Sequence, residues 1–302
     1  MTTYNSAEKA AQNIAQQVAY AADQLQLHGF GRYYNAMVGA YVSEVYKTLP
    51  YSTFAQITNR AKTPLCSVEQ AITYTTLYGK SHFDRFSSVI GQIMGRSTRT
   101  EAVTKTINIV DYGCGQAIAS LALLSYLETY VNCENFTLNF YLVEPSQTTL
   151  DIAALLVSKM SSRSAANIVI HQHHTDLAGF LATDSYTLVP ADYSLHLFSN
   201  VLDIPKVQQI IPALSTYLKS IRGKQMVIAV GPQYSNNYTG LEQLKHSLGG
   251  VTVKKDIADF SVESEIYSVT NNHWQHSHSR GVMMGLCFKN SIDDTGKIDL
   301  AA

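Results

Sequence analysis

The stretch Ile107–Ala117, which reads INIVDYGCGQA, decides the fold of this chain. It begins as an apolar strand, continues as a turn with two glycines and ends as the start of a helix. Glycine adopts positive φ and lets a ligand come close to the backbone. The N-terminus of a helix has free N–H groups and the positive end of the helix dipole. The stretch therefore predicts a ligand site between a buried strand and the helix after it.

Downstream of this stretch, short β-branched or aromatic runs alternate with longer helical patterns. The predicted strands are Ile107–Tyr112, Thr137–Val143, Asn167–His171, Tyr193–Phe198 and Gln225–Val230. The predicted helices are Gln116–Tyr130, Gln147–Met160, Pro205–Ser220 and Leu241–Leu248. This alternation predicts an α/β fold with a Rossmann-like, doubly wound, mostly parallel sheet. Two late strand candidates, Gly250–Ile257 and Gly281–Lys289, lack a helix of normal length between them and predict an antiparallel edge.

The first hundred residues predict helices instead. Apolar residues recur at helical spacing before the break at Gly29–Gly31 and again before Pro50. A capping box at Ser67–Gln70 predicts the start of a third helix, which Gly79 is expected to end. A fourth helix is expected over about 81–94, followed by a polar linker at 96–101. We therefore expect a helical region at 1–100 that acts as lid and substrate region, a ligand-binding domain at 105–290 and a frayed tail at 291–302.

Composition narrows the class of protein. The chain has 302 residues, a formal net charge of −1 and 15% charged residues. A domain that grips nucleic acid by its backbone is usually strongly basic, so this class loses weight, although a local basic patch is not excluded. The first residues lack a basic and then apolar leader, and the longest apolar runs are too short to span a bilayer. With four cysteines and no C-x-x-C pair, a reduced cytoplasmic protein is expected.

The acid before the glycines separates two kinds of ligand. A dinucleotide-binding turn reads G-x-G-x-x-G, but the third position here is Ile118. Asp111 precedes the first glycine by two residues, and its charge would repel a pyrophosphate. The carboxylate suits a ligand that has a cationic amino-acid end and no phosphate.

The run Val110–Gln116 resembles motif I of the class I S-adenosylmethionine-dependent methyltransferases. That motif has an apolar strand, an acidic residue, any residue, glycine, any residue and glycine. The resemblance covers roughly residues 105–290 and implies that S-adenosylmethionine is the cofactor. It further implies that Asp111 serves the methionine end of the cofactor, while Gly113 and Gly115 let the cofactor approach the backbone. Cys114 and Gln116 complete the turn, and Cys114 is interpreted as a small filler rather than a nucleophile.

The same resemblance assigns the rest of the cofactor site. Glu144, followed by Pro145, corresponds to the acid that holds the ribose hydroxyls, and a carboxylate can accept both bonds of a vicinal diol. Asp176 and the N–H of Leu177 correspond to the adenine contacts, although a helix capped by Thr175, with Asp176 in its first turn, is an alternative. Ser199 and Asn200, after the fourth strand, would lie beside the sulfonium or the substrate. Tyr78 or His82, on a helix ahead of motif I, would contact the cofactor carboxylate.

Two histidine clusters lie outside that assignment. They are His171, His173 and His174, and then His273, His276 and His278. Neither matches a metal-ligand spacing, so no metal is predicted. The second cluster is expected in a solvated or substrate-facing loop, in which Trp274 and His276 are candidate substrate contacts.

The expected function is transfer of a methyl group to an oxygen or nitrogen nucleophile of a small molecule, without an assigned catalytic residue. The first alternative is a cofactor-binding sensor or a ribosome- or RNA-associated factor without catalysis. An NAD-dependent oxidoreductase is a third interpretation, against which Asp111 and the missing third glycine count. Nucleic acid is not excluded as a partner, no membrane association is expected, and a homodimer stays open.

Overall fold

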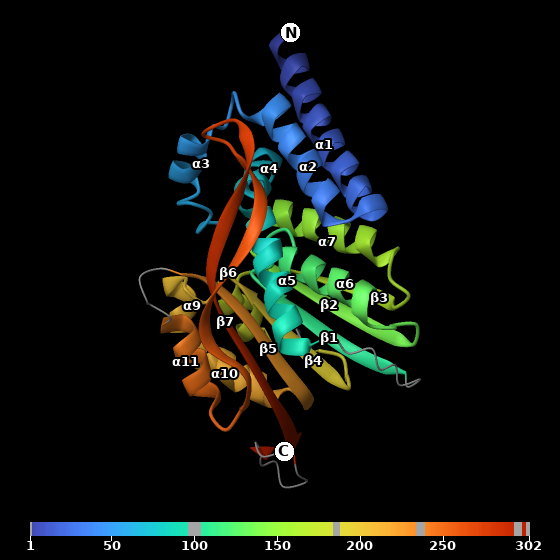
Figure 1. The fold of residues 1–302 in the computed structure, drawn as a ribbon, viewed down its shortest axis with the longest axis vertical. Coiled ribbons are helices and arrows are strands. Elements are labelled where there is room, and N and C mark those ends of the chain that lie inside the picture. The colour runs from blue at the N-terminus through green and yellow to red at the C-terminus, as the bar shows by residue number, and fades with distance from the viewer. Residues whose placement is uncertain (1, 96–103, 184–187, 234–238, 293–297, 300–302) are drawn as a thin grey trace.

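The computed structural model describes residues 2–95, 104–183, 188–233, 239–292 and 298–299. Its centre is one sheet with strand order β3-β2-β1-β4-β5-β7-β6, and β8 pairs with β7 (Figure 1). The strands are β1 (Lys105–Tyr112), β2 (Phe136–Glu144), β3 (Asn167–His174), β4 (Tyr193–Ser199), β5 (Gly223–Pro232), β6 (Thr252–Ser268), β7 (His273–Ile292) and β8 (Ile298–Asp299).

Strands β1 to β5 pair in parallel, and β7 joins β5 and β6 in antiparallel register. This confirms the predicted α/β class, with a mostly parallel sheet and an antiparallel edge. Strand β1 lies between β2 and β4, and all residues from Asn108 to Tyr112 are buried. A parallel strand that is covered on both faces needs an almost continuous apolar run, which explains the pattern that the sequence shows there.

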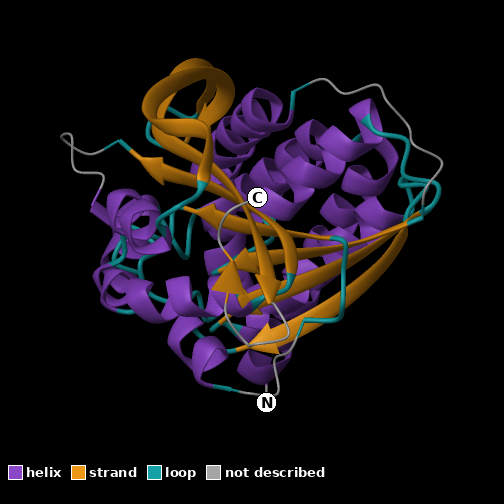
Figure 2. Ribbon diagram, turned by 90° about the horizontal axis from the view of Figure 1, so that it is seen from below, coloured by secondary structure: helices purple, strands orange, loops and turns teal. Residues whose placement is uncertain are grey.

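Helices cover both faces of the sheet (Figure 2). The helices are α1 (Thr2–His28), α2 (Phe30–Ala40), α3 (Tyr51–Ile57), α4 (Val68–Tyr74), α5 (Lys80–Met94), α6 (Ile118–Tyr130), α7 (Gln147–Ser161), α8 (Leu177–Ala182), α9 (Pro205–Gln209), α10 (Ile211–Ser220) and α11 (Thr239–Leu248). Two π-helical turns, η1 (Tyr41–Val45) and η2 (Thr75–Gly79), continue α2 and α4. Helices α1 to α7 pack on one face, and α8 to α11 pack on the other.

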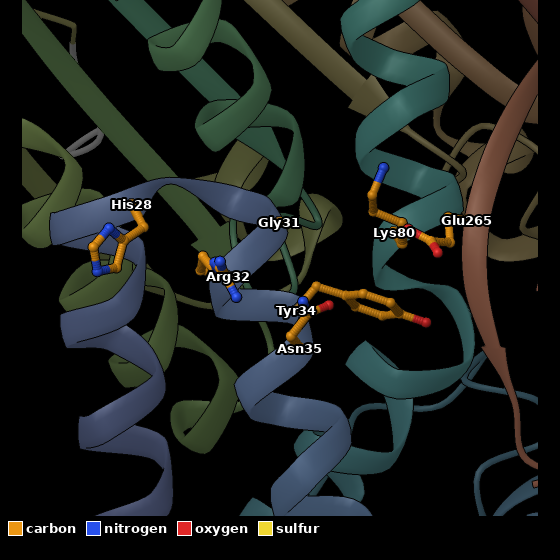
Figure 3. A pocket seen from close by; sticks show the side chains of 7 residues that line it. All are labelled: His28, Gly31, Arg32, Tyr34, Asn35, Lys80 and Glu265. Carbon is orange, nitrogen blue, oxygen red and sulfur yellow. The ribbon is translucent and has the colours of Figure 1, made fainter. Parts of the chain in front are cut away.

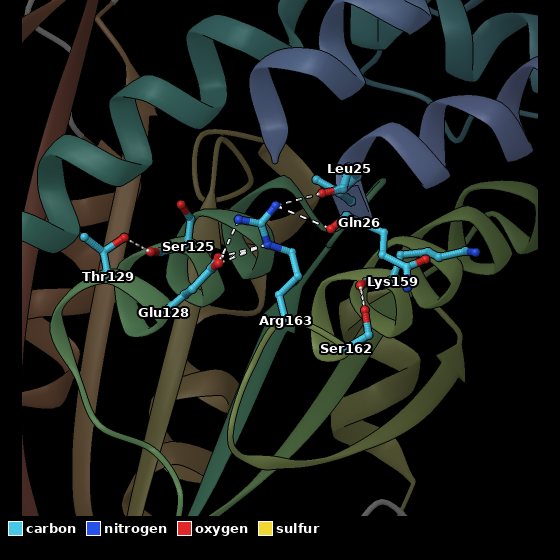
Figure 4. Close-up of polar contacts among 8 residues, drawn as sticks. All are labelled: Leu25, Gln26, Ser125, Glu128, Thr129, Lys159, Ser162 and Arg163. Carbon is cyan, nitrogen blue, oxygen red and sulfur yellow. Dashed lines mark hydrogen bonds and ion pairs between the residues drawn. The ribbon is translucent and has the colours of Figure 1, made fainter. Parts of the chain in front are cut away.

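The N-terminal helices share a core with the sheet. One hydrophobic cluster includes Leu25 of α1, Phe86 of α5, Ile109 of β1 and Met283 of β7. The end of α1 is also bound by polar contacts, because Arg163 donates to the carbonyls of Leu25 and Gln26 while it pairs with Glu128 on α6 at 2.7 Å (Figure 4). The N-terminal region is thereby fastened to the α6–α7 layer.

Sequence signals set most of the N-terminal boundaries correctly. Gly29, at φ 83°, separates α1 from α2. In the capping box, Ser67 Oγ accepts from the N–H of Gln70 at 3.3 Å. The expectation that Gly79 ends the third helix is wrong, because the chain passes through η2 directly into α5. Gly79 has right-handed helical φ and ψ, and its packing explains the residue, since an added Cβ would lie 3.0 Å from Thr75.

The last two strands are longer than predicted. The ribbon of β6 and β7 continues beyond the sheet and rises beside α4 (Figure 1). The second histidine cluster therefore lies on β7, and the loop expected there is wrong. In the outer part of β6, the residues at even positions from Ala258 to Ile266 are more buried than those at odd positions, and Tyr267 joins the core that the N-terminal helices share with the sheet. Its tip rests on the N-terminal helices through Trp274, whose ring lies 5.7 Å from that of Tyr34.

The predicted linker at 96–101 lies outside the described residues, as does most of the predicted tail. Within that tail, Ile292 pairs with Ile298 of β8. In the part of the chain that the structure describes, no helix is long and apolar enough to cross a membrane.

Gln116 provides a test of how the N-terminal helices are attached. Its Oε1 accepts from the hydroxyl of Thr75 at 2.8 Å and from that of Tyr33 at 3.3 Å, and its Nε2 donates to the carbonyl of Ala71 at 2.8 Å. Gln116→Leu should lower the free energy of unfolding by about 2–4 kcal/mol, because these buried groups lose their partner. Urea unfolding measures the loss. The matched control is Gln92→Leu at an exposed position of α5, whose free energy of unfolding should stay within about 0.5 kcal/mol of the native value. Equal effects of the two substitutions would contradict this attachment.

Candidate functional site

The site is built around the turn that joins β1 to α6. Gly113, Gly115 and Ala117 have φ of 61°, 53° and 58°. The left-handed Ala117 delays the helix, so that α6 begins at Ile118 rather than at the predicted Gln116. An added Cβ at Gly115 would meet no atom within 4 Å, whereas one at Gly113 would lie 3.1 Å from Val201. The turn is therefore open on the side of Gly115, and a ligand can reach its backbone there.

Asp111 lies buried beneath this turn. Its Oδ2 accepts from the N–H of Ser120 at 3.2 Å and from the Ser120 hydroxyl at 2.7 Å. Its Oδ1 is buried and has no hydrogen-bond partner among the described residues. Burial raises the pKa of Asp111 to about 6, against the opposing effect of the bonds from Ser120. A buried acceptor without a partner is costly and marks a place where a donor is missing.

Glu144, at the end of β2, holds the turn from the side. Its Oε2 accepts from the N–H of Gly115 at 2.9 Å, and its Oε1 accepts from the N–H of Ser146 at 3.0 Å. Burial raises the pKa of this carboxyl as well. A second bond supports the same contact, because the N–H of Cys114 donates to the carbonyl of Val143 at 3.0 Å. The structure thus brings Asp111, Glu144 and both glycines together.

Three other predicted site residues, Gln116, Cys114 and Pro145, are buried in or bonded to the protein itself. Gln116 points into the N-terminal helices and away from the open side of the turn. Burial raises the pKa of the Cys114 thiol well above its usual value, which keeps it protonated and unsuited to act as a nucleophile. The carbonyl of Pro145 lies 3.0 Å from Nε2 of His174.

Asp176 and Leu177 lie at the end of β3, one strand further out. Asp176 is exposed and caps α8, because its Oδ1 accepts from the N–H of Gly179 at 2.8 Å. The alternative that Thr175 caps this helix is wrong, because Asp176 itself is the N-cap. Leu177 is buried in the core on that face. The predicted adenine contact stays a prediction.

The exit of β4 lies next to the turn, since β4 pairs with β1 up to Tyr112 and Phe198. Asn200 has φ 58°, and its Nδ2 donates to Oγ of Ser199 at 3.2 Å. Its Oδ1 is buried without a partner in the described part of the chain, and so is Oδ1 of Asp203. Asp203 was not among the predicted site residues, although it belongs to the same polar exit segment. Burial raises its pKa, while the charges of Lys62 and Arg85 oppose that shift.

The run from α4 through η2 into α5 adds a row of rings to this side of the molecule. Tyr74 Oη lies 3.1 Å from Nδ1 of His82, and the ring of Tyr78 stacks on His82 with centroids 5.9 Å apart. Burial raises the pKa of Tyr74, an effect that the nearby Arg85 opposes and that Glu144 reinforces. The charge of Glu144 is thus close enough to act on Tyr74. Both predicted lid residues, Tyr78 and His82, lie in this row.

A left-handed loop closes the same end of β2. Asn59, Arg60 and Ala61 have consecutive φ of 47°, 56° and 64°, which is a strained arrangement for residues other than glycine. The loop leads to Leu65, whose carbonyl accepts a hydrogen bond from the hydroxyl of Ser146, directly after the Glu144 strand end. Backbone strain of this kind is frequent beside functional sites.

Two cavities lie away from the glycine turn. One of about 260 Å³ lies where α1, α2, α5 and β6 meet and is lined by His28, Gly31, Arg32, Tyr34, Asn35, Lys80 and Glu265 (Figure 3). One of about 130 Å³ lies beside Arg163 and Glu128. Within the described residues, no group of three histidines, cysteines or acids is placed to hold a metal ion.

Comparisons with known proteins concern the fold. No family model matches this chain, and neither does any curated protein. Among solved structures, a putative class I S-adenosylmethionine-dependent methyltransferase from Listeria monocytogenes is similar at 11% identity and a TM-score of 0.43, over 97% of this chain and 92% of that one. Precorrin-6y C5,15-methyltransferase from Geobacter metallireducens is similar at 14% identity and a TM-score of 0.39, over 67% of this chain and 87% of that one. The [4+2]-cyclase SpnF is similar at 12% identity and a TM-score of 0.36, over 81% of this chain and 94% of that one.

The structural neighbours of the chain thus include class I S-adenosylmethionine-dependent methyltransferases at low sequence identity. At 14% identity or less and TM-scores of 0.43 or less, this likeness assigns no role to any individual residue of the chain.

Asp111 makes stability depend on pH in a defined direction. The pKa of its carboxyl is about 6 in the folded protein, above its ordinary value of 3.8. The folded state therefore holds a proton that the unfolded state has lost between these values, and stability falls as pH rises from about 4 to 6. Asp111→Asn should remove this loss. In urea unfolding, the variant should gain up to about 3 kcal/mol relative to the native protein between about pH 4 and pH 7.5.

Asp151→Asn, on the exposed side of α7, is the matched control and should show a difference from the native protein that does not change over this range. A constant difference for Asp111→Asn too would contradict the proposed burial of the charge.

Proposed function

We propose that this chain binds S-adenosylmethionine at the carboxyl ends of β1, β2 and β4 and transfers its methyl group to an oxygen or nitrogen atom of a small molecule. The observation that carries the proposal is the buried Oδ1 of Asp111, which has no partner among the described residues directly before a glycine turn. A cationic amino group, reaching it directly or through a water, would supply the missing donor.

The charges around the turn favour this ligand over a dinucleotide. Asp111 and Glu144 are both buried within the turn region, and the hydrogen bonds that they accept there come from uncharged groups of Ser120, Gly115 and Ser146. A pyrophosphate would bring two further negative charges into this space, whereas the ammonium and sulfonium of S-adenosylmethionine bring positive ones. The side chain of Ile118 also occupies the position at which a dinucleotide turn has its third glycine.

The remaining parts of the cofactor fit the strand ends in order. The carboxylate of Glu144 accepts from the N–H groups of Gly115 and Ser146 and from the side chain of Thr149, and its remaining acceptor capacity would receive the ribose hydroxyls. Asp176 and Leu177, at the end of β3, would serve the adenine. Ser199 and Asn200, at the end of β4, would face the methyl group, and the unpartnered Oδ1 of Asn200 offers an acceptor there.

Methyl transfer by in-line displacement needs alignment and a dry pocket more than a dedicated acid or base. The lid that would exclude water is the α4–η2–α5 run, which Gln116 ties to the turn. The formal net charge of −1 supports a small-molecule acceptor over a nucleic acid.

Cofactor binding is tested by the melting temperature. S-adenosylhomocysteine at about 100 times its dissociation constant should stabilise the protein by about 2.7 kcal/mol. For a chain of 302 residues this corresponds to a rise of roughly 4 °C, and NAD should give none. An added Cβ at Gly115 meets no atom within 4 Å, but φ 53° strains any other residue by about 1–2 kcal/mol, so the rise is measured from the melting temperature of the variant itself. The side chain of Gly115→Arg would occupy the ligand space and abolish the rise.

Gly39→Arg on exposed α2, where an added Cβ also meets nothing within 4 Å, should keep the full rise. A shift with NAD, or no shift with S-adenosylhomocysteine, would refute the proposed cofactor. A normal shift without transfer of labelled methyl to any acceptor would favour a sensor over an enzyme.

A further inference from the structure

Three rings line one side of the helical run that covers the site. Tyr74, Tyr78 and His82 are spaced four residues apart, with ring centroids 5.5 to 5.9 Å from one another. In a regular α-helix, residues four apart drift by about 40° around the axis, so three of them diverge. The π-helical turn η2, Thr75–Gly79, lies within this row. Its wider turn reduces the drift and lets all three rings face the same way.

His82 has the chemistry of a neutral base. Its Nδ1 lies 3.1 Å from Tyr74 Oη, and its Nε2 makes no hydrogen bond to any described residue. Burial, and then the charge of Arg85, lowers the pKa of His82 well below 6.5, so the ring is uncharged at neutral pH. When the proton resides on Nδ1, it is donated to Tyr74, and the lone pair of Nε2 is free to accept another proton.

The row of rings lies on the helical run that is bonded to the glycine turn. The residue after Tyr74 is Thr75, whose hydroxyl bonds to Gln116 of the glycine turn at 2.8 Å. The charge of Glu144 acts on Tyr74, and that of Arg85 acts on both His82 and Asp203 of the β4 exit. The dyad therefore lies among the groups that surround the proposed cofactor site rather than on a separate surface.

The rings also define a class of acceptor. Flat aromatic faces bind a planar aromatic molecule through stacking. A weak neutral base can assist the removal of a proton from a phenol, whose pKa is about 10, far better than from an aliphatic alcohol.

We propose that His82 is the general base of the methyl transfer, that Tyr74 is its positioning residue and that the acceptor is a phenol stacked on this row. This inference rests on the proposed function. The phenol oxygen forms a bond to the methyl carbon as the carbon–sulfur bond breaks, and the electron pair of that bond returns to sulfur. The phenol proton passes to Nε2 of His82 and then to water, so that an aryl methyl ether, S-adenosylhomocysteine and a proton are formed.

The experiment compares two phenols with labelled S-adenosylmethionine in mildly alkaline buffer. The hydroxyl of para-cresol is protonated there and needs the base, whereas para-nitrophenol is already ionised. His82→Gln should lower the rate with para-cresol by about 10²-fold, at the lower end for a general base because the lowered pKa of His82 makes it a weak one. With para-nitrophenol the loss should be less than about tenfold, because no proton has to be removed. Tyr74→Phe should show the same selective loss to a smaller degree.

Binding of S-adenosylhomocysteine is measured on the same variants and should be retained. His246→Gln, at an exposed position of α11, should match the native protein in every assay. Equal losses with both phenols, or methylation of neither phenol by a native protein that binds S-adenosylhomocysteine, would overturn the assignment of His82 and of the acceptor. Loss of that binding in the native protein would instead refute the proposed function. If His82→Gln does not fold, the selective loss in Tyr74→Phe decides.

Discussion

The turn after β1 must hold three residues, Gly113, Gly115 and Ala117, at positive φ within five positions, and the site depends on how this is achieved. Glu144 accepts the N–H of Gly115 from one side, and Gln116 bonds to the N-terminal helices on another. Each contact satisfies a buried polar group, so the turn cannot relax without losing them. The open side that remains, next to Gly115, is where a ligand can approach the backbone.

The same constraint links the two halves of the chain. A sheet with a glycine turn leaves the carboxyl ends of its strands exposed, and these ends need a cover that excludes water. The α4–η2–α5 run supplies it and carries Tyr74, Tyr78 and His82 to this side, while Trp274 at the tip of the β6–β7 ribbon packs on Tyr34 of α2. The α4–η2–α5 run is thus part of the core rather than a loose appendage, which fits its proposed role as a lid that positions the substrate.

Much of this could be predicted from the sequence, and the parts that could not have physical reasons. Strand β1 and its turn could be predicted from the local sequence. Burial on both faces requires a mostly apolar run, and positive φ favours the glycines at Gly113 and Gly115. The capping box at Ser67 is equally local and was confirmed by the bond from Gln70. The outer part of the β6–β7 ribbon was missed although the sequence signals it, since Phe260, Val262 and Ile266 alternate there with exposed polar residues. Gly79 was interpreted as a helix end, although its role is close packing against Thr75. Asp203 and the Tyr74–His82 pair depend on tertiary placement, which no spacing along the chain reports.

The central claim is that the buried acid before the glycine turn receives the amino end of S-adenosylmethionine. A crystal structure with S-adenosylhomocysteine bound tests it most directly. We expect the amino nitrogen of the ligand within hydrogen-bond distance of Asp111 Oδ1, or one water away from it, and the ribose hydroxyls on Glu144. A ligand in the cavity between α1, α2, α5 and β6, or one at the turn with its amino end directed away from Asp111, would contradict the account.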